Sequence, residues 1–153
     1  MDDKSTDPAG SEFPKAAPMR RWGWALLAAV LGFSLVLGLV NLFQYMDSPF
    51  ASVPLIDEES YVEWAASLVK GDPIPVFYQD PLYPYFLAAV FKITGVPETG
   101  KPHNAWFLVR LLQVLMGTGA VMLVFYSGRK LAGNAAGLLA ALMLSLYKGV
   151  YFY

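Results

Sequence analysis

Two adjacent carboxylates, Asp57 and Glu58, are the side chains of this sequence best suited to do chemistry. A carboxylate can act as a general base on a hydroxyl group, and a pair of carboxylates can bind a divalent cation. The same two residues open a helical pattern, where acids in the first turn stabilise the helix dipole by about 0.3–1 kcal/mol each. Spacing alone leaves the catalytic, the metal-binding and the purely electrostatic interpretation open.

Arg110 is the second candidate, because it is the one charged residue in the apolar run from Ala105 to Tyr126. A charge within such a run is costly and by default indicates function. The guanidinium could hold a phosphate group through two parallel hydrogen bonds. It lies only about a turn and a half from the end of the run, so snorkelling to an interface is the alternative.

Several kinds of site are excluded by composition. The sequence has no cysteine and a single histidine, His103, which rules out disulfides, thiol nucleophiles, thiolate zinc sites and multi-histidine metal sites within it. A net charge of -1 gives no basic excess for a nucleic-acid partner. The common phosphate-loop, dinucleotide, zinc-protease and serine-hydrolase motifs are also missing from the sequence.

The elements that must position these residues are apolar helices. Of the 153 residues, 56% are hydrophobic and only 15% are charged, with a mean hydropathy of +0.45, whereas soluble domains carry about 25% charged residues. Crossing a hydrocarbon core takes about 20 apolar residues. We therefore expect an all-α integral membrane protein with three transmembrane helices, at about residues 22–46, 105–127 and 130–150. A signal peptide is the rival for the first run, which is however longer than the usual 7–15 residues or so and lacks a clear cleavage site.

Basic residues at the ends of these runs predict the orientation. Arg20 and Arg21 precede the first run, and Arg129 and Lys130 lie in the short link between the other two. Such clusters stay on the cytoplasmic side. We expect residues 1–19 to be a disordered cytoplasmic tail and residues 47–104 to be an outer loop. The expected location is the plasma membrane of a bacterium, with the protein crossing several times and its amino terminus in the cytoplasm.

The outer loop is expected to hold two juxtamembrane helices. From Asp57 to Lys70, apolar residues recur with helical spacing on one face, and Gly71 is placed to end the helix. This amphipathic helix would lie on the membrane surface. A second, almost wholly apolar helix should run from Leu82 to Thr94, with Asp80 as cap, Pro81 in the first helical position and Gly95 at the end.

Small residues suggest how the last two apolar helices pack. Gly133 and Gly137 form a G-x-x-x-G pattern that Ala141 continues, with Gly117 and Gly119 available on the preceding helix. Such faces let helix backbones approach closely in lipid. The alternative is that glycine is simply common in membrane helices.

The order of these features is more specific than any one of them. It consists of Ile56-Asp57-Glu58-Glu59-Ser60-Tyr61, Lys70-Gly71-Asp72, Gln79-Asp80-Pro81-Leu82-Tyr83-Pro84, Val109-Arg110-Leu111-Leu112-Gln113 and Gly128-Arg129-Lys130-Leu131-Ala132-Gly133. Over about residues 22–153, this series resembles the amino-terminal part of the polytopic glycosyltransferases with the GT-C fold. It is most similar to the group of dolichyl-phosphate-mannose-protein mannosyltransferases and aminoarabinose transferases (glycosyltransferase family 39 and relatives). Residues 20–153 would then be the amino-terminal part of such a membrane domain.

The resemblance implies an enzyme that transfers a hexose or pentose, with inversion, from a polyprenyl- or dolichyl-phosphate donor to an acceptor hydroxyl. The reaction would take place on the extracytoplasmic side, within membrane lipid. By position, Asp57 matches the catalytic base, Glu58 and Tyr61 match supporting residues that bind the acceptor or a metal, and Arg110 matches an arginine that could bind the lipid phosphate. A divalent cation on Asp57 and Glu58 is the one cofactor that remains open.

Three departures from the family pattern qualify this expectation. Asp80 stands where some relatives have a basic residue, and Tyr147-Lys148 stands where a proline usually closes the third span. The family also has many more spans, so we expect this sequence to be a fragment that is inactive alone. The alternative is a small membrane protein without enzymatic activity, such as an assembly partner or a piece of a transporter.

Overall fold

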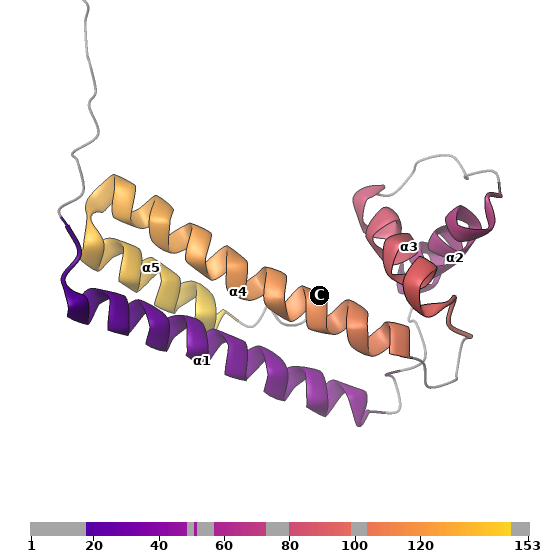
Figure 1. Cartoon of the computed structure of the whole chain (residues 1–153), viewed down its shortest axis with the longest axis horizontal. Helices are drawn as coiled ribbons and strands as arrows, with labels where there is room; N and C mark the ends of the chain where they lie inside the picture. Colours follow the sequence, from indigo (N-terminus) through magenta and orange to yellow (C-terminus); the bar gives the residue numbers. More distant parts are fainter. Residues whose placement is uncertain (1–17, 49–50, 52–56, 73–79, 99–103, 148–153) are drawn as a thin grey trace, which may run out of the picture. The chain divides into compact units, whose positions relative to one another are not determined.

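The computed structural model describes residues 18–48, 51, 57–72, 80–98 and 104–147. This part of the chain holds five α-helices and no β-strand, which confirms the all-α prediction there (Figure 1). The helices are α1 (Arg21–Met46), α2 (Asp57–Lys70), α3 (Leu82–Thr94), α4 (Asn104–Ala132) and α5 (Asn134–Leu146). The predicted tail falls almost entirely outside the described residues.

Two of these helices are long and apolar enough to cross a membrane, rather than the expected three. At 1.5 Å per residue, the 26 residues of α1 and the 29 residues of α4 extend about 39 Å and about 44 Å, beyond a ~30 Å hydrocarbon core. The 13 residues of α5 extend only about 20 Å. The residues that would lengthen this third predicted span, 148–150, lie outside the described part.

The helices divide into two compact units. The first combines the described residues up to Ser34 with those from Thr118 onward, and the second comprises Leu35–Gly117. The division runs through two continuous helices. One part of α1 and one part of α4 belong to the first unit, and the remaining part of both belongs to the second.

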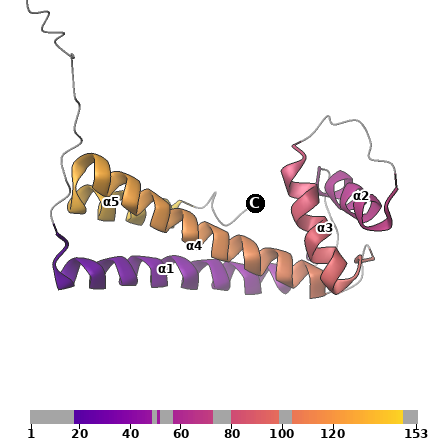
Figure 2. The ribbon, with the colours of Figure 1, turned by 45° about the horizontal axis from the view of Figure 1, so that its top comes forward.

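In the first unit, α5 turns back beside α4 (Figures 1 and 2). The expected link at Ser127–Lys130 is helical, and the turn falls at Gly133 instead. Arg129 and Lys130 are good helix formers, so their charge does not break the helix. Gly133 has a φ of +89°, which only glycine adopts without strain, and its N–H still donates to the carbonyl of Arg129 at 3.0 Å.

The hairpin closes through glycines. A side-chain carbon added at Gly137 would lie 2.6 Å from the carbonyl oxygen of Phe125, and one added at Gly128 would lie 3.0 Å from the Cα of Gly137. Gly137 and the fully buried Ala141 therefore form the predicted small-residue face. Its partner on α4 is Gly128, whereas Gly119 has open space beside it and Gly133 forms the turn.

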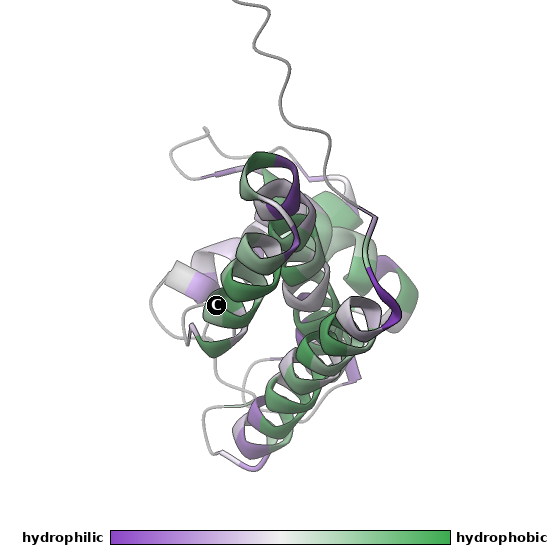
Figure 3. Cartoon of the chain, turned by 90° about the vertical axis from the view of Figure 1, so that its left-hand side faces the viewer, coloured by the Kyte–Doolittle hydropathy of each residue, from purple (hydrophilic) through white to green (hydrophobic). Residues whose placement is uncertain are grey.

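Few side chains of this unit are buried. Its core consists of Leu27, Val121, Phe125 and Ala141. Most residues of its helices are hydrophobic (Figure 3), and many large hydrophobic side chains among them are exposed, including Leu26, Leu123 and Met143. These helices thus pack along narrow seams and present the rest of their apolar surface outward.

In the second unit, α2 and α3 pack against each other and against the beginning of α4. The buried core is formed by Ala65, Leu87, Val90, Phe91, Ala105 and Val109. The apolar face of α2, which we expected on the membrane surface, is covered by this packing, and both Trp64 and Ala65 are buried. A helical pattern of apolar residues predicts a buried face without specifying its partner.

Glycines end both loop helices as predicted. Gly71, at φ +79°, follows α2, and the N–H of Asp72 donates to the carbonyl of Ser67 at 3.0 Å, which is a Schellman closure. Gly95 follows α3 and its N–H donates to Phe91 at 2.8 Å. The start of α3 differs by one residue, since Pro81 occupies the N-cap position that we expected for Asp80.

Candidate functional site

The candidate site lies in the second unit, where Glu58 on α2 meets Arg110 on α4. Nη2 of Arg110 lies 3.5 Å from Oε1 of Glu58. The Arg110 side chain is 20% exposed and that of Glu58 is 43% exposed. The fold thus brings together two of the candidates that the sequence singled out, and it leaves the carboxylate within reach of solvent.

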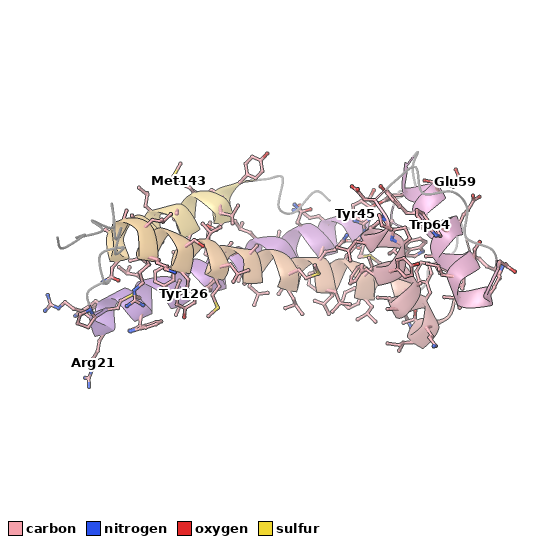
Figure 4. All side chains as sticks on the ribbon, turned by 90° about the horizontal axis from the view of Figure 1, so that it is seen from above. Arg21, Tyr45, Glu59, Trp64, Tyr126 and Met143 are labelled. Atoms are coloured by element: carbon pink, nitrogen blue, oxygen red, sulfur yellow. The ribbon has the colours of Figure 1, made fainter. Side chains whose placement is uncertain are left out.

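Tyr45, in the last turn of α1 and labelled in Figure 4, also contacts the guanidinium. The Cζ atom of Arg110 lies 3.5 Å from the centroid of the Tyr45 ring. A cation over an aromatic face is stabilised by about 0.5–2 kcal/mol, depending on how much water is excluded. Arg110 therefore contacts both a carboxylate and an aromatic ring.

Tyr83 on α3 adds a hydroxyl group to the site. Nε2 of Gln113 donates a hydrogen bond to the Tyr83 oxygen at 3.3 Å. Burial raises the pKa of Tyr83 above its usual 10.0, and the negative charge of Glu58 raises it further, while Arg110 and the Gln113 bond act in the opposite direction. The phenol is therefore neutral at physiological pH, and its own O–H is available to donate.

Tyr61 reaches the site only through Tyr83. The two rings meet edge to face with their centroids 5.3 Å apart. Tyr83 also stacks on Phe86 at 6.2 Å. Tyr61 therefore has the position of a residue that orients Tyr83, one ring away from the charged pair.

These groups border a small, partly open cleft with an enclosed volume of about 10 Å³. Its lining is formed by Glu58, Val62, Tyr83, Leu87, Trp106, Val109, Arg110 and Gln113. One part of this lining is charged or hydrogen-bonding and the other is apolar. The enclosed part of the cleft has room for about one water molecule, and its lining presents a polar and an apolar side.

The main catalytic candidate, Asp57, is the first residue of α2, and its side chain lies outside the described part of the chain. His103 lies outside it as well. Within the described residues no three His, Cys, Asp or Glu side chains gather as a metal site would require. A cation site on Asp57 and Glu58 would include a side chain outside the described part, so it stays a prediction.

Four residues of the site were not predicted from the sequence. Trp106, Arg110 and Gln113 follow each other at i, i+4 and i+7, which places them on one face of α4. That spacing was a usable signal for Trp106 and Gln113. Tyr83 stood within a quoted motif without a role, and Tyr45 was assigned no role in the site.

Chemically, the arrangement offers a proton acceptor, a fixed cation and a neutral hydroxyl donor within one cleft. Glu58 faces one of the two terminal nitrogens of Arg110, and a guanidinium carries five N–H donors. Arg110 could thus bind an anionic oxygen as well as Glu58. Comparisons of the chain with models of known protein families, with curated proteins and with solved structures find no match, so any function rests on the geometry of this cleft and on the sequence motifs that form it.

Proposed function

We propose that this chain forms part of a membrane glycosyltransferase of the GT-C type. The enzyme would move a sugar from a polyprenyl- or dolichyl-phosphate donor to an acceptor hydroxyl on the extracytoplasmic side. The observation that supports this most directly is the Glu58–Arg110 pair, at 3.5 Å, in a cleft between the loop helices and an end of a long apolar helix. By sequence position, Glu58 belongs to the D-E motif and Arg110 matches the arginine of the second span in the family that the sequence resembles.

The exposure of the long helices supports a membrane location. Only 22% of the apolar stretch of α1 and 17% of that of α4 is buried. The core helix of a soluble protein would be covered by its neighbours, whereas a helix in a bilayer keeps an apolar surface toward lipid. We propose that α1 and α4 cross the bilayer and that α5 begins a third crossing.

The proposed reaction needs a base and a site for the leaving phosphate. Asp57 takes the proton from the acceptor hydroxyl, and the resulting oxygen attacks the anomeric carbon of the donor sugar. The bond between that carbon and the phosphate oxygen breaks, and the lipid phosphate leaves with the bonding electron pair. Arg110 stabilises the charge that develops on that phosphate.

Glu58 has a separate role in this proposal. Its carboxylate is paired with Arg110 before any donor binds. An incoming phosphate carries more negative charge and accepts the same N–H groups, so it competes with Glu58 for the guanidinium. The released carboxylate would then be free to bind the acceptor hydroxyl.

The test is sugar transfer in membranes that contain the complete reading frame of this chain, with a labelled polyprenyl-phosphate sugar. Asp57→Asn should reduce the transfer rate by a factor on the order of 10² or more, since general-base catalysis contributes about 10²–10⁴. Arg110→Gln should also lower the rate. Glu63→Gln removes an exposed acid of the same helix and should leave transfer unchanged. Full activity of Asp57→Asn would contradict the assignment of the base.

A second candidate is a membrane protein without enzymatic activity, in which Glu58 and Arg110 only fasten α2 to α4. The closed ion pair favours this interpretation. Exchanging the two charges, with Glu58→Arg and Arg110→Glu together, separates the candidates. A fastening role predicts that this double variant has the thermal stability and the cellular function of the wild type. The transferase proposal predicts a stable but inactive protein.

A further inference from the structure

We propose that the cleft lined by Glu58, Tyr83 and Trp106 binds a single hydroxyl oxygen, to which the indole N–H of Trp106 donates a hydrogen bond. The oxygen belongs to a water molecule or to the hydroxyl group of a small organic molecule. All residues that line the cleft are part of the second unit. The inference concerns this binding site alone, so it is independent of any sugar transfer.

Trp106 is a buried donor that calls for an acceptor. The residue is 9% exposed, and its ring meets that of the buried Phe91 edge to face, with the centroids 6.2 Å apart. Its Nε1 atom is buried and has no hydrogen-bond partner among the described residues. A buried indole N–H usually has a partner, because an unpaired one loses its hydration without compensation. We therefore expect an oxygen of a ligand beside Nε1.

The cleft is where that oxygen can lie. Trp106 lines it together with Arg110, which follows one turn later on the same face of α4. The enclosed volume of about 10 Å³ is close to the roughly 10–15 Å³ that one water molecule needs. Since the cleft is partly open, a carbon atom bonded to the oxygen can extend into its mouth. The ligand thus contributes one oxygen atom to the interior.

The other polar groups of the cleft suit a hydroxyl better than an anion. The Tyr83 oxygen accepts from Gln113, so its own O–H is a second donor, and each carboxylate oxygen of Glu58 can accept. A hydroxyl group both accepts and donates, and so matches both kinds of partner. Glu58 already opposes the charge of Arg110 at 3.5 Å, and an anion in the cleft would face that carboxylate.

The test is nuclear magnetic resonance of the full chain, labelled with ¹⁵N, in detergent micelles. The four tryptophans give four indole N–H signals, and loss of one in Trp106→Phe, or its contact with the ring protons of Phe91, identifies that of Trp106. We expect this signal to show a nuclear Overhauser cross-peak to long-lived water. When methanol is added, a new cross-peak to its methyl protons means that the site takes an organic hydroxyl, whereas an unchanged water cross-peak means that it is a water site. A Trp106 signal with neither cross-peak would overturn the proposal.

Two controls test whether the cross-peak comes from a ligand in the cleft. The hydroxyl proton of Tyr83 exchanges with water and could imitate it, so the cross-peak must persist in Tyr83→Phe, and its loss there would overturn the proposal. Trp22 is 80% exposed and serves as the internal reference. Its indole meets only transient water and should lack the cross-peak. Equal cross-peaks from Trp22 and Trp106 would mean that the cleft holds no specific hydroxyl.

Discussion

Arg110 illustrates how a single residue can be recognised from sequence while its partner cannot. A lone charge in an apolar run is conspicuous, and so are adjacent acids after the first apolar run. Their pairing at 3.5 Å depends on how α2 packs against α3 and α4. That packing involves residues far apart in the chain, for which neither spacing nor charge gives a signal. The same limit explains why Tyr45 was not expected beneath the guanidinium.

Tyr83 leads to a prediction about pH. Its pKa is raised mainly by burial, so folded protein retains the phenol proton at pH values where unfolded chain has lost it. This contribution to stability is present below pH 10 and is lost as the pH rises through the folded pKa. We expect the ultraviolet difference titration between wild type and Tyr83→Phe to show a tyrosine that ionises above pH 10.

Glu58→Gln supplies the control for that titration. Removing this carboxylate removes one of the causes that raise the pKa of Tyr83, so the difference titration should move to lower pH. Glu59→Gln, on the exposed side of α2, should leave it in place. A Tyr83 that titrates at or below the ordinary tyrosine value would show that the phenol is not buried in the cleft.

Among the helices, α2 and α3 were predicted almost to the residue because glycines end both of them. Gly71 and Gly95 have positive φ values that stop a helix whatever the surroundings. The link between α4 and α5 was placed too early, because two charges in an apolar context resemble a loop. Arg and Lys continue a helix readily, and only the glycine at position 133 reverses the chain.

The hairpin of α4 and α5 gives a prediction at the scale of these helices. Gly137→Ala would place a carbon 2.6 Å from the Phe125 carbonyl oxygen and 2.9 Å from the Arg129 nitrogen. Both are backbone atoms, so the helices must move apart, which we expect to cost about 1–3 kcal/mol of unfolding free energy. Denaturation in micelles, followed by circular dichroism, measures this loss.

Gly119→Ala is the matched control, because an added carbon there has no neighbour within 4 Å. Alanine has the higher helix propensity, so this variant should be as stable as wild type or slightly more stable. If both alanine variants have the stability of wild type, the two helices do not approach as closely as the glycine contacts require.

For the molecule as a whole, the sequence predicts a membrane topology with three crossings. The helix lengths support this only in part, because two of the described helices are long enough to cross. The basic residues predict that α4 ends in the cytoplasm and that the loop helices lie outside. The chain has no cysteine, so single cysteines can be introduced without background. In intact cells, an impermeant maleimide should label Lys70→Cys on α2 and should not label Lys130→Cys until the membrane is opened.

Tyr147→Cys addresses the third crossing, because this exposed residue directly follows α5. If α5 begins a crossing that starts in the cytoplasm, position 147 approaches the outer surface and should be labelled from outside. Labelling only after the membrane is opened would instead mean that α5 folds back along the inner surface, and the chain would cross twice. Lys130→Cys is the internal reference in both cases, since it lies only a few residues before the turn at Gly133. A Lys130→Cys that is labelled in intact cells would contradict the orientation itself, and with it the placement of the Glu58–Arg110 cleft outside the cell.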